Sequence, residues 1–163
     1  MLRIRDDFID KFVPTPKAKE YYLIGSLRNE RISEIGNTLR ASGINIFDSW
    51  FAAGPLADDC WRDYEQARGH DFPKALRGYA AQHVFEFDKR HLDRTDGAIL
   101  CLPAGRSGHL ELGYVIGSGK PGYILMEGEP ERFDVMYAFT QVHGGGVFYD
   151  INELIAAIKQ NDK

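Results

Sequence analysis

Residues 96–114 read DGAILCLPAGRSGHLELGY, and this stretch decides the fold class. An apolar run of strand length ends at Pro103, Gly105 and Gly108 then break the chain, and a helical pattern follows. A buried strand, a glycine-rich turn and a helix in this order form one unit of a parallel α/β sheet. We expect Glu111 in the first turn of that helix, at the carboxyl end of the strand, where open α/β sheets bind ligands.

Glu111 has a chemical and a structural interpretation. The positive end of the helix would keep its carboxylate ionised, as a nucleophile requires. Acidic residues also favour the first turns of helices for purely structural reasons. This segment alone does not separate the two interpretations.

Similar units repeat along the rest of the chain. Short apolar runs alternate with helical patterns, and this alternation predicts a doubly wound parallel sheet. Five strands in a single domain from a chain of 163 residues fit the flavodoxin-like arrangement. The expected strands are 21–24, 44–47, 98–102, 122–126 and 146–149, and the expected helices are 32–39, 79–95, the Glu111 helix and 151–159.

Two parts of the chain do not follow this alternation. Residues 1–19 have mixed charge and contain Pro14 and Pro16, so we expect an N-terminal arm ahead of an α/β domain at residues 20–163. Residues 49–73 are rich in tryptophan, glycine and aspartate, and we expect a long irregular insertion. Its length and aromatic content indicate a functional lid or an interface.

Composition limits the class of protein. A hydrophobic content of 44% with 27% charged residues is typical of a soluble globular domain. The net charge of −4 argues against a nucleic-acid polymer as partner. No apolar stretch approaches the roughly 18 residues that a bilayer requires, and the N-terminus is too charged for a secretory signal. We therefore expect a cytoplasmic protein that does not bind membranes.

Asp88 is a second candidate carboxylate. It lies between Val84 and Leu92 at four-residue spacing, so it would stand in an apolar row of its helix. A carboxylate that faces a core is costly unless it is paired or takes part in chemistry. A helix rotated to leave Asp88 on the rim would remove the need for either explanation.

The turn Gly25-Ser26-Leu27-Arg28 follows the first expected strand and precedes a helix. Backbone donors, a hydroxyl and a guanidinium at a helix N-terminus can bind a phosphate. The plain alternative is a solvated Arg28. The chain lacks the lysine of a P-loop and the full glycine motif of a dinucleotide site, so neither an ATPase nor a dehydrogenase is indicated.

Histidine and cysteine spacing matches no zinc site, and nothing in the sequence requires a metal or an organic cofactor. His109 stands two residues before Glu111, where it would either orient a substrate or cover the turn. Trp50, Phe51 and Trp61 could stack on a nucleobase or close onto the core.

Three blocks of sequence, in this order, resemble the nucleoside 2-deoxyribosyltransferase superfamily, which includes deoxynucleoside 5′-monophosphate N-glycosidases. The blocks are YLIGSLR at residues 22–28, Asp88 placed eight residues before Asp96, and LELGY at 110–114 followed by GKP at 119–121. The resemblance runs from Tyr22 to about Met126, with residues 49–73 as an insertion.

The resemblance implies a transferase or hydrolase of N-glycosidic bonds, acting on a small nucleoside or nucleotide. Glu111 would attack the anomeric carbon and hold the sugar as a glycosyl ester, which a second base or water then displaces with retention. Tyr22 would position Glu111 by a hydrogen bond, and Asp88 would contact the sugar or the base. The implied substrate-binding residues are Gly25, Ser26, Arg28, Gly105, Ser107, Gly108 and His109.

Two departures from the family pattern leave the substrate open. Transferases of the family carry an acidic residue six positions before the glutamate, where this chain has Gly105. The monophosphate hydrolases have a phosphate-binding serine there, and the nearest serine in this chain is Ser107. A neighbouring subunit often completes the site in this family, so a homodimer or a larger homo-oligomer is implied.

A non-catalytic nucleotide-binding module on the same fold is the main alternative. The insertion and the missing acid at Gly105 favour it, whereas a binding function alone would not require both Glu111 and Asp88. A flavodoxin-like redox protein is a third and weaker alternative.

Overall fold

The computed structural model describes residues 18–163, and the predicted arm at residues 1–19 falls almost entirely outside this range. One sheet of five parallel strands organises the described chain. Its order is β2-β1-β3-β4-β5, which is the flavodoxin-like order. The predicted fold class is confirmed, and the strands are β1 (Glu20–Ile24), β2 (Asn45–Phe47), β3 (Gly97–Cys101), β4 (Gly122–Leu125) and β5 (Gly146–Phe148).

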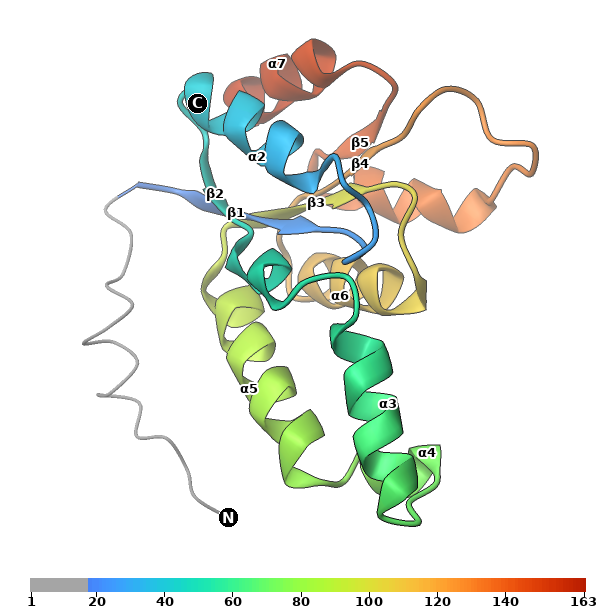
Figure 1. The fold of residues 1–163 in the computed structure, drawn as a ribbon. Helices are drawn as coiled ribbons and strands as arrows, with labels where there is room; N and C mark the ends of the chain where they lie inside the picture. Colours follow the sequence, from blue (N-terminus) through green and yellow to red (C-terminus); the bar gives the residue numbers. More distant parts are fainter. Residues whose placement is uncertain (1–17) are drawn as a thin grey trace.

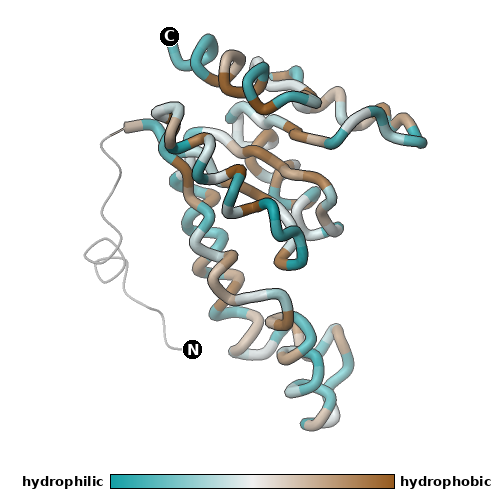
Figure 2. Tube along the Cα trace, turned by 45° about the horizontal axis from the view of Figure 1, so that its top comes forward, coloured by the Kyte–Doolittle hydropathy of each residue, from teal (hydrophilic) through white to brown (hydrophobic). Residues whose placement is uncertain are grey.

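Helices cover both faces of the sheet (Figure 1). Helices α2 (Ile32–Ala41) and α7 (Ile151–Asn161) pack on one face, where their isoleucines and leucines join one buried cluster. Helices α5 (Tyr79–Arg94) and α6 (Arg106–Gly117) pack on the other face and contribute to a second buried cluster. The apolar residues gather in the strands and in the helix surfaces that face them (Figure 2).

The alternation of side chains along β1 decides which residue reaches which face. Tyr21 and Leu23 belong to the cluster under α2 and α7, and Tyr22 and Ile24 belong to the cluster under α5 and α6. A shift of one residue in the pairing of β1 would exchange these two sets. The register therefore places Tyr22 on the same face as the helices that carry Asp88 and Glu111.

The predicted irregular region at residues 49–73 is wrong in its secondary structure. It contains the 3-10 helix η1 (Ser49–Ala53), the helix α3 (Ala57–Ala67) and the short helix α4 (Phe72–Ala75). The only buried residue of α3 is Glu65, although Ala57, Cys60, Trp61 and Tyr64 stand at the spacing of one helical face. Local signals were present: α3 has acidic residues in its first turn, and Asp71 caps α4 by accepting from the Lys74 backbone N–H at 2.9 Å.

Helices α3 and α4 project away from the sheet beside the first turns of α5 (Figure 1). Neither of the two buried clusters contains a residue of α3 or α4. A further 3-10 segment that the sequence did not predict, η2 (Val135–His143), precedes β5. Among residues 18–163, no helix is both long and apolar enough to cross a membrane.

Candidate active site

Three polar side chains from three different elements meet on the α5–α6 face of the sheet. The Tyr22 hydroxyl, from β1, donates a hydrogen bond to the Asp88 carboxylate of α5. The Glu111 carboxylate of α6 lies close enough to both for its charge to interact with the Tyr22 hydroxyl and with Asp88. We refer to Tyr22, Asp88 and Glu111 as the carboxylate cluster.

The fold fixes each member of this cluster by packing next to it. The Tyr22 side chain is buried, and its ring lies 5.0 Å from the Phe47 ring of β2. Helix α5 contacts the core through its last turns, where His91 and Leu92 are buried, and Asp88 stands one turn earlier. In α6, Leu112 is buried in the core directly after Glu111.

Gly108 lets α6 approach the sheet closely. A Cβ atom at this position would lie 3.0 Å from Cγ2 of Ile24 and 3.1 Å from Cδ1 of Leu100. Such contacts are tighter than ordinary van der Waals spacing, so a larger residue would push the helix outward unless its neighbours gave way. Gly108 therefore has a packing role that helps to set the height of Glu111 above the sheet, and its implied substrate-binding role stays a prediction.

Polar contacts also tie α5 to α6. The Lys120 ammonium, just beyond α6, donates to the carbonyl oxygens of Leu92 at 3.2 Å and of Asp93 at 2.7 Å. These carbonyls belong to the last turn of α5, where a cation is favourable. The Tyr114 hydroxyl of α6 donates to the Asp93 carboxylate. These contacts hold the end of α5 against α6. They thereby help to fix the spacing between Asp88 and Glu111.

Burial dominates the electrostatics of the cluster. Burial, and secondly the charge of Asp88, raise the pKa of Glu111 to about 7. Burial also raises the pKa of Asp88, and the hydrogen bond from Tyr22 partly opposes this shift. Burial and the two nearby carboxylates raise the pKa of Tyr22, so its hydroxyl remains a donor. Two neighbouring, half-buried carboxyl groups resist being ionised at the same time. Carboxyl pairs of this kind are common in acid–base and nucleophilic sites.

The expected position of Glu111 in the first turn of its helix is wrong. Helix α6 begins at Arg106, so Glu111 is in its second turn and not in its first. The effect of the helix dipole falls off within the first turn, and burial therefore prevails at Glu111.

The expected apolar row through Asp88 is also wrong in part. Leu92 is buried, but Val84 is 59% exposed because α5 extends beyond the edge of the core there. The Tyr22 hydroxyl and the Glu111 carboxylate both interact with Asp88. The hydrogen bond of Tyr22 goes to Asp88, where the family resemblance implied Glu111.

His91, one turn after Asp88, is buried and lies flat on Phe47, with ring centroids 3.7 Å apart. Burial, and then the charges of Arg94 and Arg90, lower the pKa of His91 to about 4. The imidazole is therefore neutral and enclosed, and it acts as an aromatic packing residue rather than as an acid or base.

The loop after β1 differs from the predicted helix N-terminus. Helix α2 begins only at Ile32, so the amides of Gly25 and Ser26 are not its first donors. The Ser26 hydroxyl accepts from the Arg28 backbone N–H at 3.1 Å. The Arg28 guanidinium is not simply solvated, because it forms an ion pair with Asp59 of α3 at 2.8 Å.

The loop after β3 supplies the remaining predicted residues. Gly105 and Ser107 are exposed at the start of α6, where no side chain caps the helix. His109 Nδ1 lies 2.9 Å from the Gly105 carbonyl oxygen, so this nitrogen is the donor. His109 Nε2 then accepts from the Tyr137 hydroxyl at 2.9 Å. His109 thus links α6 to η2, and its two hydrogen bonds are with Gly105 and Tyr137 rather than with the carboxylate cluster.

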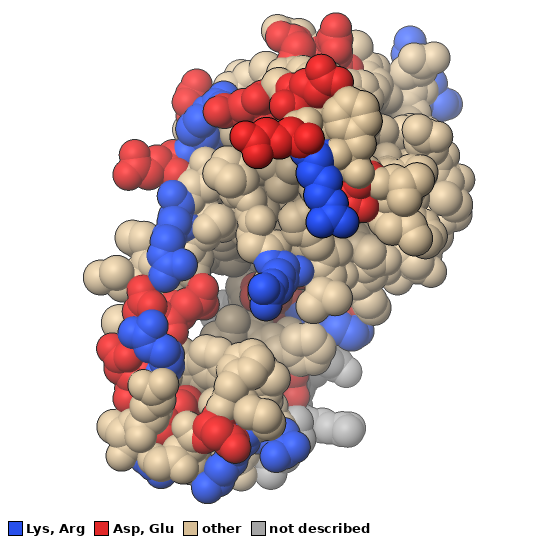
Figure 3. All heavy atoms as spheres, turned by 90° about the vertical axis from the view of Figure 1, so that its right-hand side faces the viewer, with Lys and Arg blue, Asp and Glu red and all other residues tan. Residues whose placement is uncertain are grey.

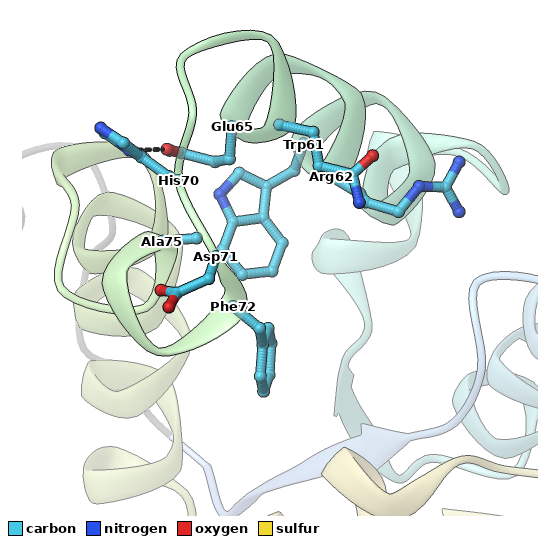
Figure 4. Close-up of a pocket in the computed structure, with 8 residues that line it drawn as sticks. Trp61, Arg62, Glu65, His70, Asp71, Phe72 and Ala75 are labelled. Atoms are coloured by element: carbon cyan, nitrogen blue, oxygen red, sulfur yellow. Dashed lines mark hydrogen bonds and ion pairs between the residues drawn. The ribbon is translucent and has the colours of Figure 1, made fainter.

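A small pocket that the sequence did not predict lies between α3 and α4 (Figure 4). Trp61, Phe72 and Ala75 line it, and the buried Glu65 accepts a bond from His70 Nδ1 at 2.7 Å. This pocket does not include the carboxylate cluster.

The Trp50 side chain, in contrast, is held against the sheet. Its indole N–H donates to the Leu23 carbonyl oxygen at 2.7 Å, and its ring packs against both buried clusters. Trp50 therefore closes onto the core, which was one of the two interpretations of this side chain.

A second pocket opens at the carboxyl ends of the strands, beside Leu102. Its polar lining includes Tyr149, Asp150 and the ion pair of Arg31 with Glu127. Tyr149 and Asp150 directly follow β5 and Glu127 closely follows β4, which was the available sequence signal, whereas Arg31 stands directly before α2. Figure 3 looks onto the side to which the strands point and shows the molecule hollowed between the sheet body above and the α3–α4 region below.

No protein-family model matches the chain, and no curated protein sequence matches it. Among solved structures, the chain is similar to the CMP N-glycosidase BcmB of Clostridium botulinum, at 15% sequence identity and a TM-score of 0.49. The similarity covers 86% of this chain and 99% of that chain. At this level it supports no conclusion about the chemistry of this protein, which must be argued from the side chains described above.

Replacing Glu111 should stabilise the protein at alkaline pH. The pKa of Glu111 is about 7 when folded, against an ordinary value of about 4.5, so the folded state holds a proton that the unfolded state loses between these values. Its contribution to stability is therefore lost as the pH rises from about 4.5 to about 7. Glu111→Gln should raise the free energy of unfolding by about 1–3 kcal/mol at pH 8 and by much less at pH 4.5, measured by urea denaturation.

The matched control is Glu131→Gln at an exposed loop position, which should change little at either pH. An equal effect of Glu111→Gln at both pH values would show that burial does not hold a proton on Glu111.

Proposed function

We propose that this protein cleaves the N-glycosidic bond of a 2′-deoxynucleoside or its 5′-monophosphate and transfers the deoxyribosyl group to another base or to water. One observation carries the proposal: Tyr22, Asp88 and Glu111 come from separate elements into one half-buried cluster. Burying two carboxylates together costs stability, and such an arrangement is typical of a site that uses them. The sequence resemblance gives this chemistry its substrate class.

In the proposed reaction, a Glu111 oxygen attacks the anomeric carbon of the sugar as the bond to the base breaks. The electron pair of that bond leaves with the base, and the sugar remains as a glycosyl ester of Glu111. A second base or a water molecule then attacks the same carbon and frees the carboxylate, with net retention. Asp88 contacts the sugar or the base, and Tyr22 holds Asp88 by the hydrogen bond described above.

The loops after β1 and β3 are proposed to hold the rest of the substrate. These strands are neighbours in the sheet, so their following loops flank one crevice. Gly25, Ser26 and Arg28 would meet the 5′ end, and Gly105 and Ser107 offer exposed donors at the start of α6.

We also propose that the protein forms a homodimer or a larger homo-oligomer. Large apolar side chains are exposed along the first half of α5, including Tyr79 (77%), Val84 (59%) and Phe85 (63%). Large apolar side chains that are exposed in a single chain are often covered in a protein interface. Light scattering coupled to size exclusion should give a mass of at least twice 18.4 kDa, and Phe85→Glu should lower it. A monomeric mass at micromolar concentration would contradict this proposal.

The activity can be tested by measuring free base chromatographically. The protein should release base from one or more members of a panel of deoxynucleosides and 5′-monophosphates, with or without an acceptor base. Glu111→Ala should reduce the rate by about a thousandfold, because the nucleophile is lost. Dependence on the acceptor base separates a transferase from a hydrolase.

Glu131→Ala, in an exposed loop, serves as the matched control and should retain full activity. Binding of substrates without release of base, unchanged by Glu111→Ala, would instead support a nucleotide-binding module.

The pH profile of base release reports the charge of the cluster. If ionised Glu111 is the nucleophile, kcat/KM should rise with pH through a midpoint near 7. Asp88→Asn removes the negative charge that raises the pKa of Glu111, so it should lower the activity and move this midpoint to lower pH. Asp63→Asn, at an exposed position of α3, should leave the midpoint in place.

The urea experiment gives the same information without turnover. The pH window in which Glu111→Gln is stabilising should move to lower values in an Asp88→Asn background. An unchanged midpoint and an unchanged window would show that Asp88 does not act on Glu111.

A further inference from the structure

The α3 helix is joined to the loop after β1 by a charged contact. Arg28 Nη2 lies 2.8 Å from Asp59 Oδ2, and Asp59 Oδ1 lies 2.9 Å from Arg62 Nη1. One carboxylate thus bridges two guanidinium groups, one from the loop that would meet the 5′ end of a substrate and one from α3 itself. Since α3 belongs to neither buried cluster, this contact joins it to the site region through surface charge rather than through core packing.

Asp59 pairs with Arg28 Nη2, which is one of the donors that an incoming anion could use. A guanidinium offers a planar set of N–H donors suited to a carboxylate or a phosphate, and one edge of the Arg28 group is already used. The Arg28 side chain is 59% exposed, so its other donors remain open to solvent. An anion that approaches Arg28 therefore meets both an attractive guanidinium and a repulsive carboxylate.

We propose that Asp59 is a specificity-determining residue, because it competes with the 5′-phosphate of the substrate for Arg28. This inference rests on the function proposed above. With Asp59 in place, the phosphate gains little over a neutral 5′-hydroxyl, since binding it requires breaking or sharing the Arg28–Asp59 pair. The side chain at position 59 thereby sets the preference between nucleoside and nucleoside monophosphate, and α3 carries this residue into the site.

The arrangement also couples the substrate to the position of α3. A phosphate that takes Arg28 from Asp59 removes the ion pair between this helix and the loop after β1. Asp59 keeps Arg62 as a partner on its own helix, so the carboxylate is not left uncompensated when Arg28 leaves. Exchange of one partner for another in this way needs no rearrangement of the sheet.

The test is a comparison of Asp59→Asn with Asp63→Asn. Asp63 is on the same helix and pairs with Arg62 but has no ion pair with Arg28, so it controls for the loss of a negative charge and for the release of Arg62. Binding of inorganic phosphate and of the four common 2′-deoxynucleoside 5′-monophosphates is measured by calorimetry at low salt. Asp59→Asn should tighten phosphate and monophosphate binding by about tenfold, and Arg28→Ala, Asp59→Asn together should abolish the gain.

Binding of the matching nucleosides should be unchanged by Asp59→Asn. In the base-release assay, the ratio of kcat/KM for monophosphate over nucleoside should rise by a similar factor. Equal gains in Asp63→Asn, or no gain in Asp59→Asn, would overturn the proposal. The calorimetric result does not depend on turnover, so a protein that releases no base but binds phosphate more tightly in Asp59→Asn would refute the proposed reaction and still support the competition at Arg28.

Discussion

Two carboxylates held beside a buried tyrosine hydroxyl are the constraint on which the rest of this structure depends. Bringing Asp88 and Glu111 together is unfavourable, because each carboxylate loses hydration in the cluster and repels the other. Their proximity is maintained by packing that has no chemical role, such as Leu92 under α5 and Leu112 under α6. The hydrophobic energy of the sheet and its helices offsets the electrostatic cost of the site.

The same logic explains the contacts between α5 and α6. Lys120 binds the carbonyls at the end of α5, and Tyr114 holds Asp93, so two helices from different parts of the chain act as one support. The GKP block that resembles the family pattern therefore has a structural explanation in this protein, because its lysine fixes the helix that carries Asp88. Gly108 contributes by letting α6 lie close to Ile24 and Leu100.

The sheet was predictable because its signals are local and repeated. Runs such as residues 98–102 are apolar, short and bounded by glycine or proline, and strand order follows from rules for parallel α/β units. Helix α3 was not predicted, although Ala57, Cys60, Trp61 and Tyr64 follow a helical spacing, because the tryptophan, glycine and aspartate content of the region indicated a loop. Sequence reasoning identified the three members of the cluster but not their mutual contacts. The partner of Tyr22 and the pKa of Glu111 depend on where α5 leaves the core and where α6 begins, and neither is a property of the local sequence.

Exclusion of α3 and α4 from both buried clusters has a consequence for how this protein can change over evolutionary time. Residues of the carboxylate cluster are bound to the packing of the sheet, so most substitutions around them carry a penalty in folding. Substitutions in α3 alter a surface that the core does not need, and this helix can vary in sequence and length while the carboxylate cluster stays intact. Under the proposed function, substrate range can therefore drift in one part of the molecule while the carboxylate cluster is retained in another.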